Sequence, residues 1–152
     1  MGSASYSEDG DGYSGAVGDY ALDLGAVNDQ STAVTSEGDH FSEPFDTNEL
    51  SVAFWQNTTA VGNTSAFWMV APNANGTQRG FQAHTPWGNG TIYFDQSGCC
   101  GAPQRLTVGG LVNTDTCQHF VFQRNEEGTM EIWVDGQLAA SQEGAEPLDE
   151  FN

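Results

Sequence analysis

The stretch between residues 117 and 141 constrains the fold of this chain more than any other part of it. Between Thr129 and Asp135 the side chains alternate with a period of two, which places the aliphatic set on one face of a strand: Met130, Ile132 and Val134. Asp135-Gly136 then separates this run from another, and Asp-Gly is a strong hairpin signal because glycine tolerates the positive φ of a tight turn. The sequence therefore predicts antiparallel strands with one face turned to a core.

Short strand-like segments separated by turn residues recur along most of the chain. We predict strands at Asp19–Leu24, Ser31–Thr35, Leu50–Gln56, Ser65–Ala71, Gln78–Thr85, Thr91–Asp95, Arg105–Val108, Cys117–Arg124, Thr129–Asp135 and Gln137–Ser141. No segment shows a convincing helical period, and the 19 glycines suit a domain with many turns. The predicted fold class is all-β, a two-sheet antiparallel sandwich or jelly roll.

The charge balance excludes some partners. The chain has 3 basic and 21 acidic residues and a net charge of −18, with no lysine and with Arg79, Arg105 and Arg124 as its cations. Such a surface repels phosphate backbones and anionic membranes, which are bound through Lys and Arg. No window approaches the roughly 18 apolar residues of a membrane span. We expect neither nucleic acid binding nor membrane insertion; divalent cations and neutral ligands remain compatible with this charge.

The three cysteines leave two alternatives open. Cys99 and Cys100 are adjacent and cannot easily bond each other, because their Cβ vectors diverge on an extended backbone. Either one of them, with Cys100 as our choice, pairs with Cys117, or all three are buried thiols. No second Cys/His pair at ligand spacing accompanies them, so a zinc site is not predicted.

Catalytic carboxylates are the first chemistry to test in a β-sandwich. Glu131 and Asp135 share one strand face but are four residues apart, which is about 13 Å at about 3.3 Å per residue. Retaining glycosidases need about 5–5.5 Å between their carboxyl groups and inverting ones about 6.5–9.5 Å. We therefore expect no enzyme, and a glycoside hydrolase is the least favoured function.

Sugar recognition is the chemistry that the aromatic residues favour. A pyranose stacks its apolar face on an aromatic ring and binds polar groups at its edge. Trp87 lies in a predicted turn and is the best candidate platform; the alternative is that it folds over the hairpin as a lid on the core. Its neighbours in sequence complete the predicted ligand site: His84, Asn89, Tyr93 and Arg79. The other tryptophans, Trp55, Trp68 and Trp133, lie within strands and are predicted to pack.

Several motifs, in order, resemble one family. Gly18–Leu24 resembles an opening strand G-x-x-A-L-x-F/L, Leu50–Trp55 resembles F-T-V-S-F-W, and His119–Phe122 with Ile132–Gly136 resembles a W-x-H-V…I-Y-V-D-G closing hairpin. Asp95–Gly101 with Arg105 resembles a variant of secreted bacterial members. The chain is thus similar to laminin G-like jelly-roll domains of the concanavalin A-like lectin/glucanase superfamily. The likeness covers residues 18–152, and residues 1–17 are interpreted as a flexible acidic leader.

The resemblance implies further properties. Laminin G-like domains often hold a Ca²⁺ at the sandwich rim, and the expected ligands here are Asp9, Asp11, Asp39 and Asp95. Family members typically continue into further strands beyond the position of Asn152, so a sheet edge is left open, filled by the leader or completed by another chain. Cys117 stands where the family usually has Trp, which is consistent with a disulfide in place of an aromatic plug.

The expected function is that of a non-catalytic extracellular or cell-surface module that binds a polysaccharide or glycan, with Ca²⁺ in support. The alternative is a structural domain of a surface layer or fibre, completed by a neighbouring protein chain through the open sheet edge.

Overall fold

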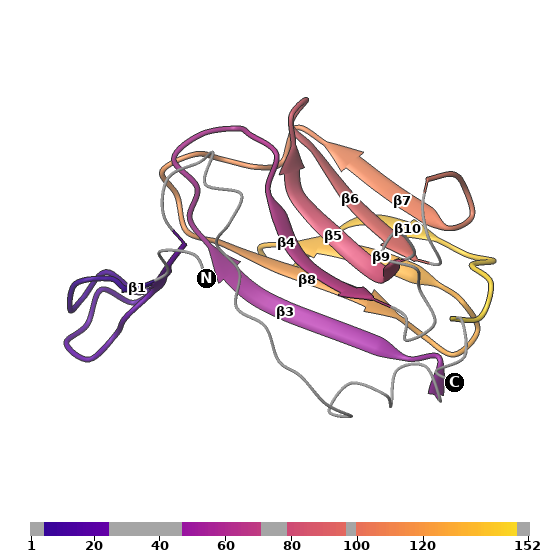
Figure 1. Cartoon of the computed structure of the whole chain (residues 1–152), viewed down its shortest axis with the longest axis horizontal. Coiled ribbons are helices and arrows are strands. Elements are labelled where there is room, and N and C mark those ends of the chain that lie inside the picture. Colours follow the sequence, from indigo (N-terminus) through magenta and orange to yellow (C-terminus); the bar gives the residue numbers. More distant parts are fainter. Residues whose placement is uncertain (1–4, 25–46, 71–78, 97–99, 149–152) are drawn as a thin grey trace. The chain divides into compact units, whose positions relative to one another are not determined.

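The structure is a computed structural model that describes residues 5–24, 47–70, 79–96 and 100–148 (Figure 1). The chain forms two compact units, residues 1–38 and residues 39–152. The predicted strand at Ser31–Thr35 lies outside the described residues. No helix in the described ranges is long and apolar enough to cross a membrane.

The first unit contains a short two-stranded ribbon. β1 (Ser5–Tyr6) pairs antiparallel with β2 (Leu22–Asp23). Turns between them are closed by carboxylates: Asp19 accepts hydrogen bonds from the backbone N and the hydroxyl of Ser14, at 2.5 and 2.6 Å. The predicted strand at Asp19–Leu24 is therefore reduced to two residues, and the described part of the predicted leader pairs with it.

The second unit is a sandwich of two four-stranded antiparallel sheets, layered one over the other in Figure 1. One sheet has the order β10-β9-β8-β3, formed by Gln137–Gln142, Met130–Val134, Gln118–Arg124 and Leu50–Gln56. The other has the order β4-β5-β6-β7, formed by Ser65–Val70, Arg79–Trp87, Thr91–Gln96 and Arg105–Gly109. The all-β jelly-roll sandwich that the sequence predicts is thus confirmed.

The core lies between the sheets and is built from alternate residues of each strand. Met130, Ile132 and Val134 are buried, as their spacing predicts. Phenylalanines from both sheets meet at the centre: the ring of Phe122 lies 5.5 Å from both Phe67 and Phe94, centroid to centroid. These edge-on contacts join the layers, because offset and T-shaped geometries are the favoured ones for aromatic pairs.

The hairpin at Asp135-Gly136 forms as predicted. Both residues have positive φ, 51° and 77°, which is the type I′ geometry that matches the twist of the flanking strands. The Asp135 carboxylate also accepts a hydrogen bond from the backbone N of His119 at 2.8 Å and from Gln118 Nε2 at 3.1 Å. Asp135 therefore fixes the start of β8 as well as the turn.

The structure does not contain the predicted disulfide between Cys100 and Cys117. Cys117 is half-buried, is not disulfide-bonded and lies directly before β8. Cys100 follows the end of β6, where Gln96 contacts Arg124 at the opposite end of β8. Six residue steps along β8 span about 20 Å, whereas a disulfide needs Cα atoms within about 7 Å. The two cysteines thus lie at opposite ends of the sandwich.

Candidate functional site

The candidate site lies on the outer face of the β4-β5-β6-β7 sheet. Phe81, Ala83, Ile92 and Phe94 point into the core, so the alternation of β5 and β6 turns the residues between them outward. His84 pairs with Tyr93 in the register of these strands. A register shift follows His84, after which Trp87 pairs with Thr91. Because Thr91 and Tyr93 share a face, the shift returns Trp87 to the outer face beside His84.

Trp87 and His84 form the centre of the site. Their rings lie 4.4 Å apart, centroid to centroid, and are tilted by 54°. His84 is 5% exposed and its Nδ1 lies 3.1 Å from the hydroxyl of Ser65, whereas Trp87 is 41% exposed. One side of the Trp87 ring thus lies against His84 on the outer face rather than over the core, and the residue still presents a large surface to solvent.

Asn89 and Tyr93 lie beside this pair. Asn89 is exposed in the turn after Trp87, where its Oδ1 accepts a hydrogen bond from the backbone N of Thr91 at 3.1 Å. Its Nδ2 reaches the Tyr93 hydroxyl at 3.4 Å, and the Tyr93 ring stands edge-on to His84 at 6.2 Å. Four of the five predicted ligand-binding residues thus gather at one end of the sheet.

The fifth predicted residue, Arg79, does not join them. It begins β5 and pairs with Val70, five positions before His84 and so about 16 Å along the strand. Arg105 of β7 lies where Arg79 was expected, beside Tyr93. Its guanidinium carbon lies 4.6 Å from the centroid of the Tyr93 ring, a cation–π geometry. Sequence proximity suggested Arg79, whereas cross-strand pairing selects Arg105.

Asp95 is a partner of Arg105 in the structure. The carboxylate accepts from Arg105 Nε at 2.5 Å and from Nη2 at 2.8 Å, and Gln82 Nε2 donates to it at 2.8 Å. Asp95 is 1% exposed, and its hydrogen bonds raise the pKa of the Arg105 guanidinium above its ordinary value. Both carboxylate oxygens accept hydrogen bonds from protein donors, and the role of Asp95 as a rim calcium ligand stays a prediction.

The remaining predicted calcium ligands are not brought into a metal site by the described residues. Asp9 and Asp11 are exposed in the ribbon, where Asp9 Oδ1 accepts from the backbone N of Gly18 at 2.5 Å. Asp39 lies outside the described residues. Over the part of the chain that is described, no group of three or more His, Cys, Asp or Glu side chains is placed to hold a metal ion. Calcium stays a prediction.

Trp68 belongs to the same outer face, and the prediction that it packs within its strand is wrong. It pairs with Gln82 across β4 and β5 and is 55% exposed, whereas its neighbour Phe67 enters the core. The sequence around it, Ala66 to Val70, is apolar on both faces and indicates a fully buried strand. Alternation along the strand places Trp68 and Phe67 on opposite faces of β4. Nothing in the sequence shows which of these two faces packs against the other sheet.

Comparison with known proteins identifies this architecture. A family model of the laminin G type, described as "Concanavalin A-like lectin/glucanases superfamily", matches residues 28–152. The chain belongs to this superfamily. A comparison with curated proteins finds no match.

Membership of the concanavalin A-like superfamily gives coarse functional limits. Its laminin G-like domains are generally non-catalytic binding modules of extracellular proteins that bind carbohydrates or proteins, although the superfamily also includes glycosidases. In this laminin G-like chain, the aromatic and polar groups described above are suited to binding. Fold alone does not assign the ligand, because related folds host many functions.

Proposed function

We propose that the protein is a non-catalytic extracellular module that binds carbohydrate on the outer face of the β4-β5-β6-β7 sheet. The observation that carries the proposal is that two exposed tryptophans share this face with accessible polar side chains. Trp68 is 55% and Trp87 41% exposed, while Asn89 is exposed and Tyr93 is half-buried. Surface aromatic rings beside fixed polar groups are the chemistry that a pyranose requires.

Each tryptophan offers an apolar platform for one sugar ring, and the polar side chains beside Trp87 are already held in place. Asn89 is fixed by the backbone of its own turn, and Tyr93 by Arg105 and His84. Arg105 is neutralised by Asp95, so no net positive charge is directed at a ligand. The proposed ligand is therefore a neutral polysaccharide rather than a sulfated or uronic one.

The test is a glycan array followed by calorimetry with the bound glycan. Trp87→Ala and Trp68→Ala should each weaken binding by about tenfold, equivalent to about 1.4 kcal/mol, the size expected for an aromatic contact. Trp55→Ala is the matched control, because Trp55 is 45% exposed on the other sheet. Absence of any bound glycan, or equal loss in all three variants, would contradict the proposal.

Calcium enters this proposal as a support for the site rather than as a contact with the sugar. Repeating the calorimetry after chelation, and again after adding back Ca²⁺ or Mg²⁺, tests it. A requirement for Ca²⁺ should show as weaker binding that only Ca²⁺ restores. Unchanged affinity after chelation removes calcium from the proposal and leaves the tryptophan site intact.

A further inference from the structure

The outer face of the other sheet, β10-β9-β8-β3, carries a surface of a different kind. Ala53 pairs with Val121, Val121 with Trp133, and Trp133 with Leu138, so one apolar row crosses all four strands. Trp55 lies next along β3, with its ring 4.8 Å from that of His119. We call the surface made by these residues and by Ser51, Gln123 and Glu131 the β3-side face.

The apolar part of this face is open to solvent. Trp55 is 45% and Leu138 50% exposed, and they lie on the two outer strands of the sheet, with half-buried Val121 and Trp133 between them. A contiguous exposed apolar surface with a polar rim is a feature of interaction sites. Its aliphatic members distinguish it from the candidate sugar site, because pyranose rings stack on aromatic faces.

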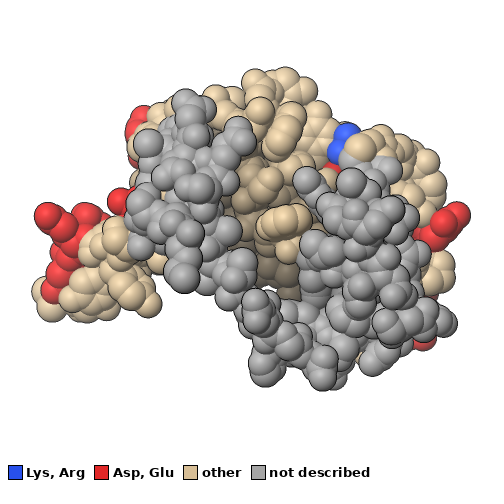
Figure 2. Space-filling model, in the orientation of Figure 1, with Lys and Arg blue, Asp and Glu red and all other residues tan. Residues whose placement is uncertain are grey.

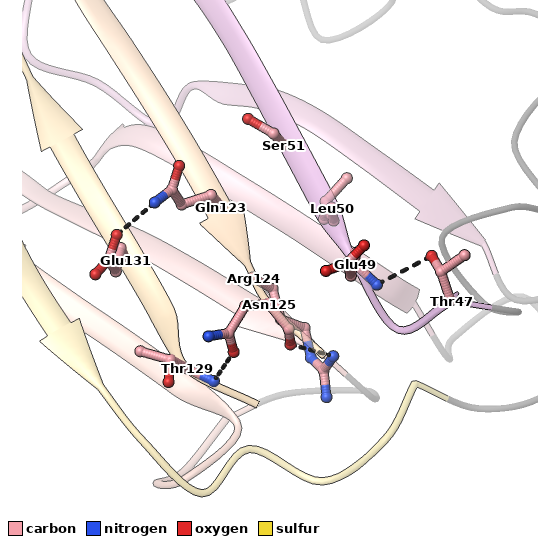
Figure 3. A pocket seen from close by; sticks show the side chains of 9 residues that line it. All are labelled: Thr47, Glu49, Leu50, Ser51, Gln123, Arg124, Asn125, Thr129 and Glu131. Carbon is pink, nitrogen blue, oxygen red and sulfur yellow. Dashed lines mark hydrogen bonds between the residues drawn. The ribbon is translucent and has the colours of Figure 1, made fainter. Parts of the chain in front are cut away.

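A polar pocket continues the face along the strands (Figure 3). Ser51, Gln123 and Glu131 occupy one row across β3, β8 and β9, directly beside the apolar row. Glu49 and the turn residues Asn125 and Thr129 complete the wall. Carboxylate, amide and hydroxyl oxygens therefore line a hollow that adjoins the half-buried side chains of Val121 and Trp133.

Glu131 is held in one orientation within this pocket. Its Oε2 accepts a hydrogen bond from Gln123 Nε2 at 2.5 Å and another from Trp133 Nε1 at 2.9 Å. Among the described residues no donor reaches its Oε1. The carboxylate is thus fixed through one oxygen while the other remains an acceptor, which lowers the entropy that an incoming donor must lose on binding.

No protein cation of the described residues neutralises this face. Arg124 borders the pocket but is 3% exposed, and its guanidinium donates to Gln96, Asn48 O and Glu146 O. Arg79 and Arg105 belong to strands of the other sheet, and the chain has no lysine. Glu49 and Glu131 therefore give the face a negative potential within a chain of net charge −18.

We propose that the β3-side face binds a cationic segment of another protein, in which Lys or Arg alternates with apolar residues. An ammonium or guanidinium group enters the pocket and donates to Glu131 Oε1, while apolar side chains cover Trp133, Val121 and Trp55. Charge complementarity selects this occupant over a second copy of the chain, which carries the same net charge of −18 and would be repelled. The site is separate from the proposed sugar site and does not depend on it.

The experiment measures binding of short synthetic peptides to the full chain by fluorescence anisotropy at low and physiological salt. The probe alternates lysine and valine, and two control peptides replace lysine by glutamate or valine by serine. We expect the lysine–valine peptide alone to bind, with affinity falling as salt screens the charges. Glu131→Gln and Trp55→Ala should each weaken it about tenfold, as central contacts of an interface do.

Matched variants separate this site from general attraction to an acidic protein. Glu126→Gln removes the same charge from an exposed turn, and Trp68→Ala removes an exposed tryptophan from the other sheet; both should change affinity less than twofold. Leu138→Ser provides a second apolar variant if Trp55→Ala fails to fold.

Several outcomes overturn the proposal. Among them are no binding of the lysine–valine peptide, equal binding of the lysine–serine peptide, equal loss in Glu126→Gln, and a dimer that Trp55→Ala dissociates. A neutral glycan whose binding is lost in Trp55→Ala but not in Trp68→Ala would also overturn it, and would move the sugar site to this face.

Discussion

Arg124 Nε donates a hydrogen bond to Gln96 Oε1 at 2.7 Å and so ties the last residue of β8 to the last residue of β6 in the opposite sheet. The same guanidinium donates to the backbone oxygens of Asn125 and Glu146 at 3.0 Å, and to that of Asn48. Burial lowers the pKa of Arg124, and the described acceptors around it are neutral oxygens. One buried cation thus joins both sheets and the segment after β10.

Replacement of Arg124 should therefore be among the most damaging single changes. Arg124→Leu leaves several buried acceptors without a donor, each at a cost of about 1–3 kcal/mol, so we expect a loss of at least about 3 kcal/mol in the free energy of unfolding. Arg124→Lys should lose less free energy of unfolding than Arg124→Leu, but it should still be less stable than the native chain, because one ammonium group cannot reach all the acceptors. Urea unfolding measures both. A loss below 1 kcal/mol in Arg124→Leu would show that these hydrogen bonds contribute little.

Gly128 offers a second stability test with a close control. Its φ is +84°, and a Cβ there would lie 2.3 Å from the backbone O of Ala145. Gly110 has φ +75° with nothing within 4 Å of its Cβ position. Gly110→Ala should lose about 1 kcal/mol from backbone strain alone, whereas Gly128→Ala should lose about 2 kcal/mol or more, because the turn or the Ala145 segment must move. Equal losses of stability in the two variants, measured by thermal unfolding, would show that the contact between the new Cβ and the Ala145 oxygen adds nothing to the backbone strain.

The strands of the sandwich could be predicted from the sequence because each carries its own alternation. β3 forms at Leu50–Gln56, the predicted range, and β8 differs from its prediction by one residue. Asp135-Gly136 forms the expected turn since its residues meet a local demand for positive φ. By contrast, β1 at Ser5–Tyr6 has only two residues and is exposed, so it has no alternation of polar and apolar residues from which a strand could be predicted.

The candidate site could be predicted only in part, because it depends on which strands are neighbours. His84, Trp87, Asn89 and Tyr93 belong to one hairpin, so proximity in the chain brought them together. Arg105 enters through β6–β7 pairing and Trp68 through β4–β5 pairing, which local patterns do not specify. The same limit explains the cysteines, whose spacing along the chain says nothing about their positions at opposite ends of β8.

The turn that Asp19 closes in the ribbon should lose stability in acid. Hydrogen bonds from Ser14 to its carboxylate lower the pKa of Asp19 below its ordinary value. A lowered pKa in the folded state stabilises the turn above the ordinary pKa of about 3.9, and this contribution is lost as pH falls through the folded value. Ser14→Ala should therefore raise the pKa of Asp19 in a carboxyl NMR titration. Ser7→Ala is the control, because the Ser7 hydroxyl donates to the backbone oxygen of Glu8 and accepts from the backbone N of Ala21, so its hydrogen bonds lie in the same ribbon but do not involve the Asp19 carboxylate.

Salt should raise the melting temperature, because 21 acidic and 3 basic residues repel one another in the compact chain. At about 0.1 M salt the screening length is about 10 Å, so most of this repulsion is removed well before molar salt. Each 1 kcal/mol gained should raise the melting temperature by roughly 4 °C for a chain of this size.

Calorimetric melts in NaCl, and with Ca²⁺ or Mg²⁺ at constant ionic strength, separate screening from specific binding. A predicted calcium site requires Ca²⁺ to stabilise more than Mg²⁺; equal effects would leave screening alone, and a melting temperature independent of salt would contradict both.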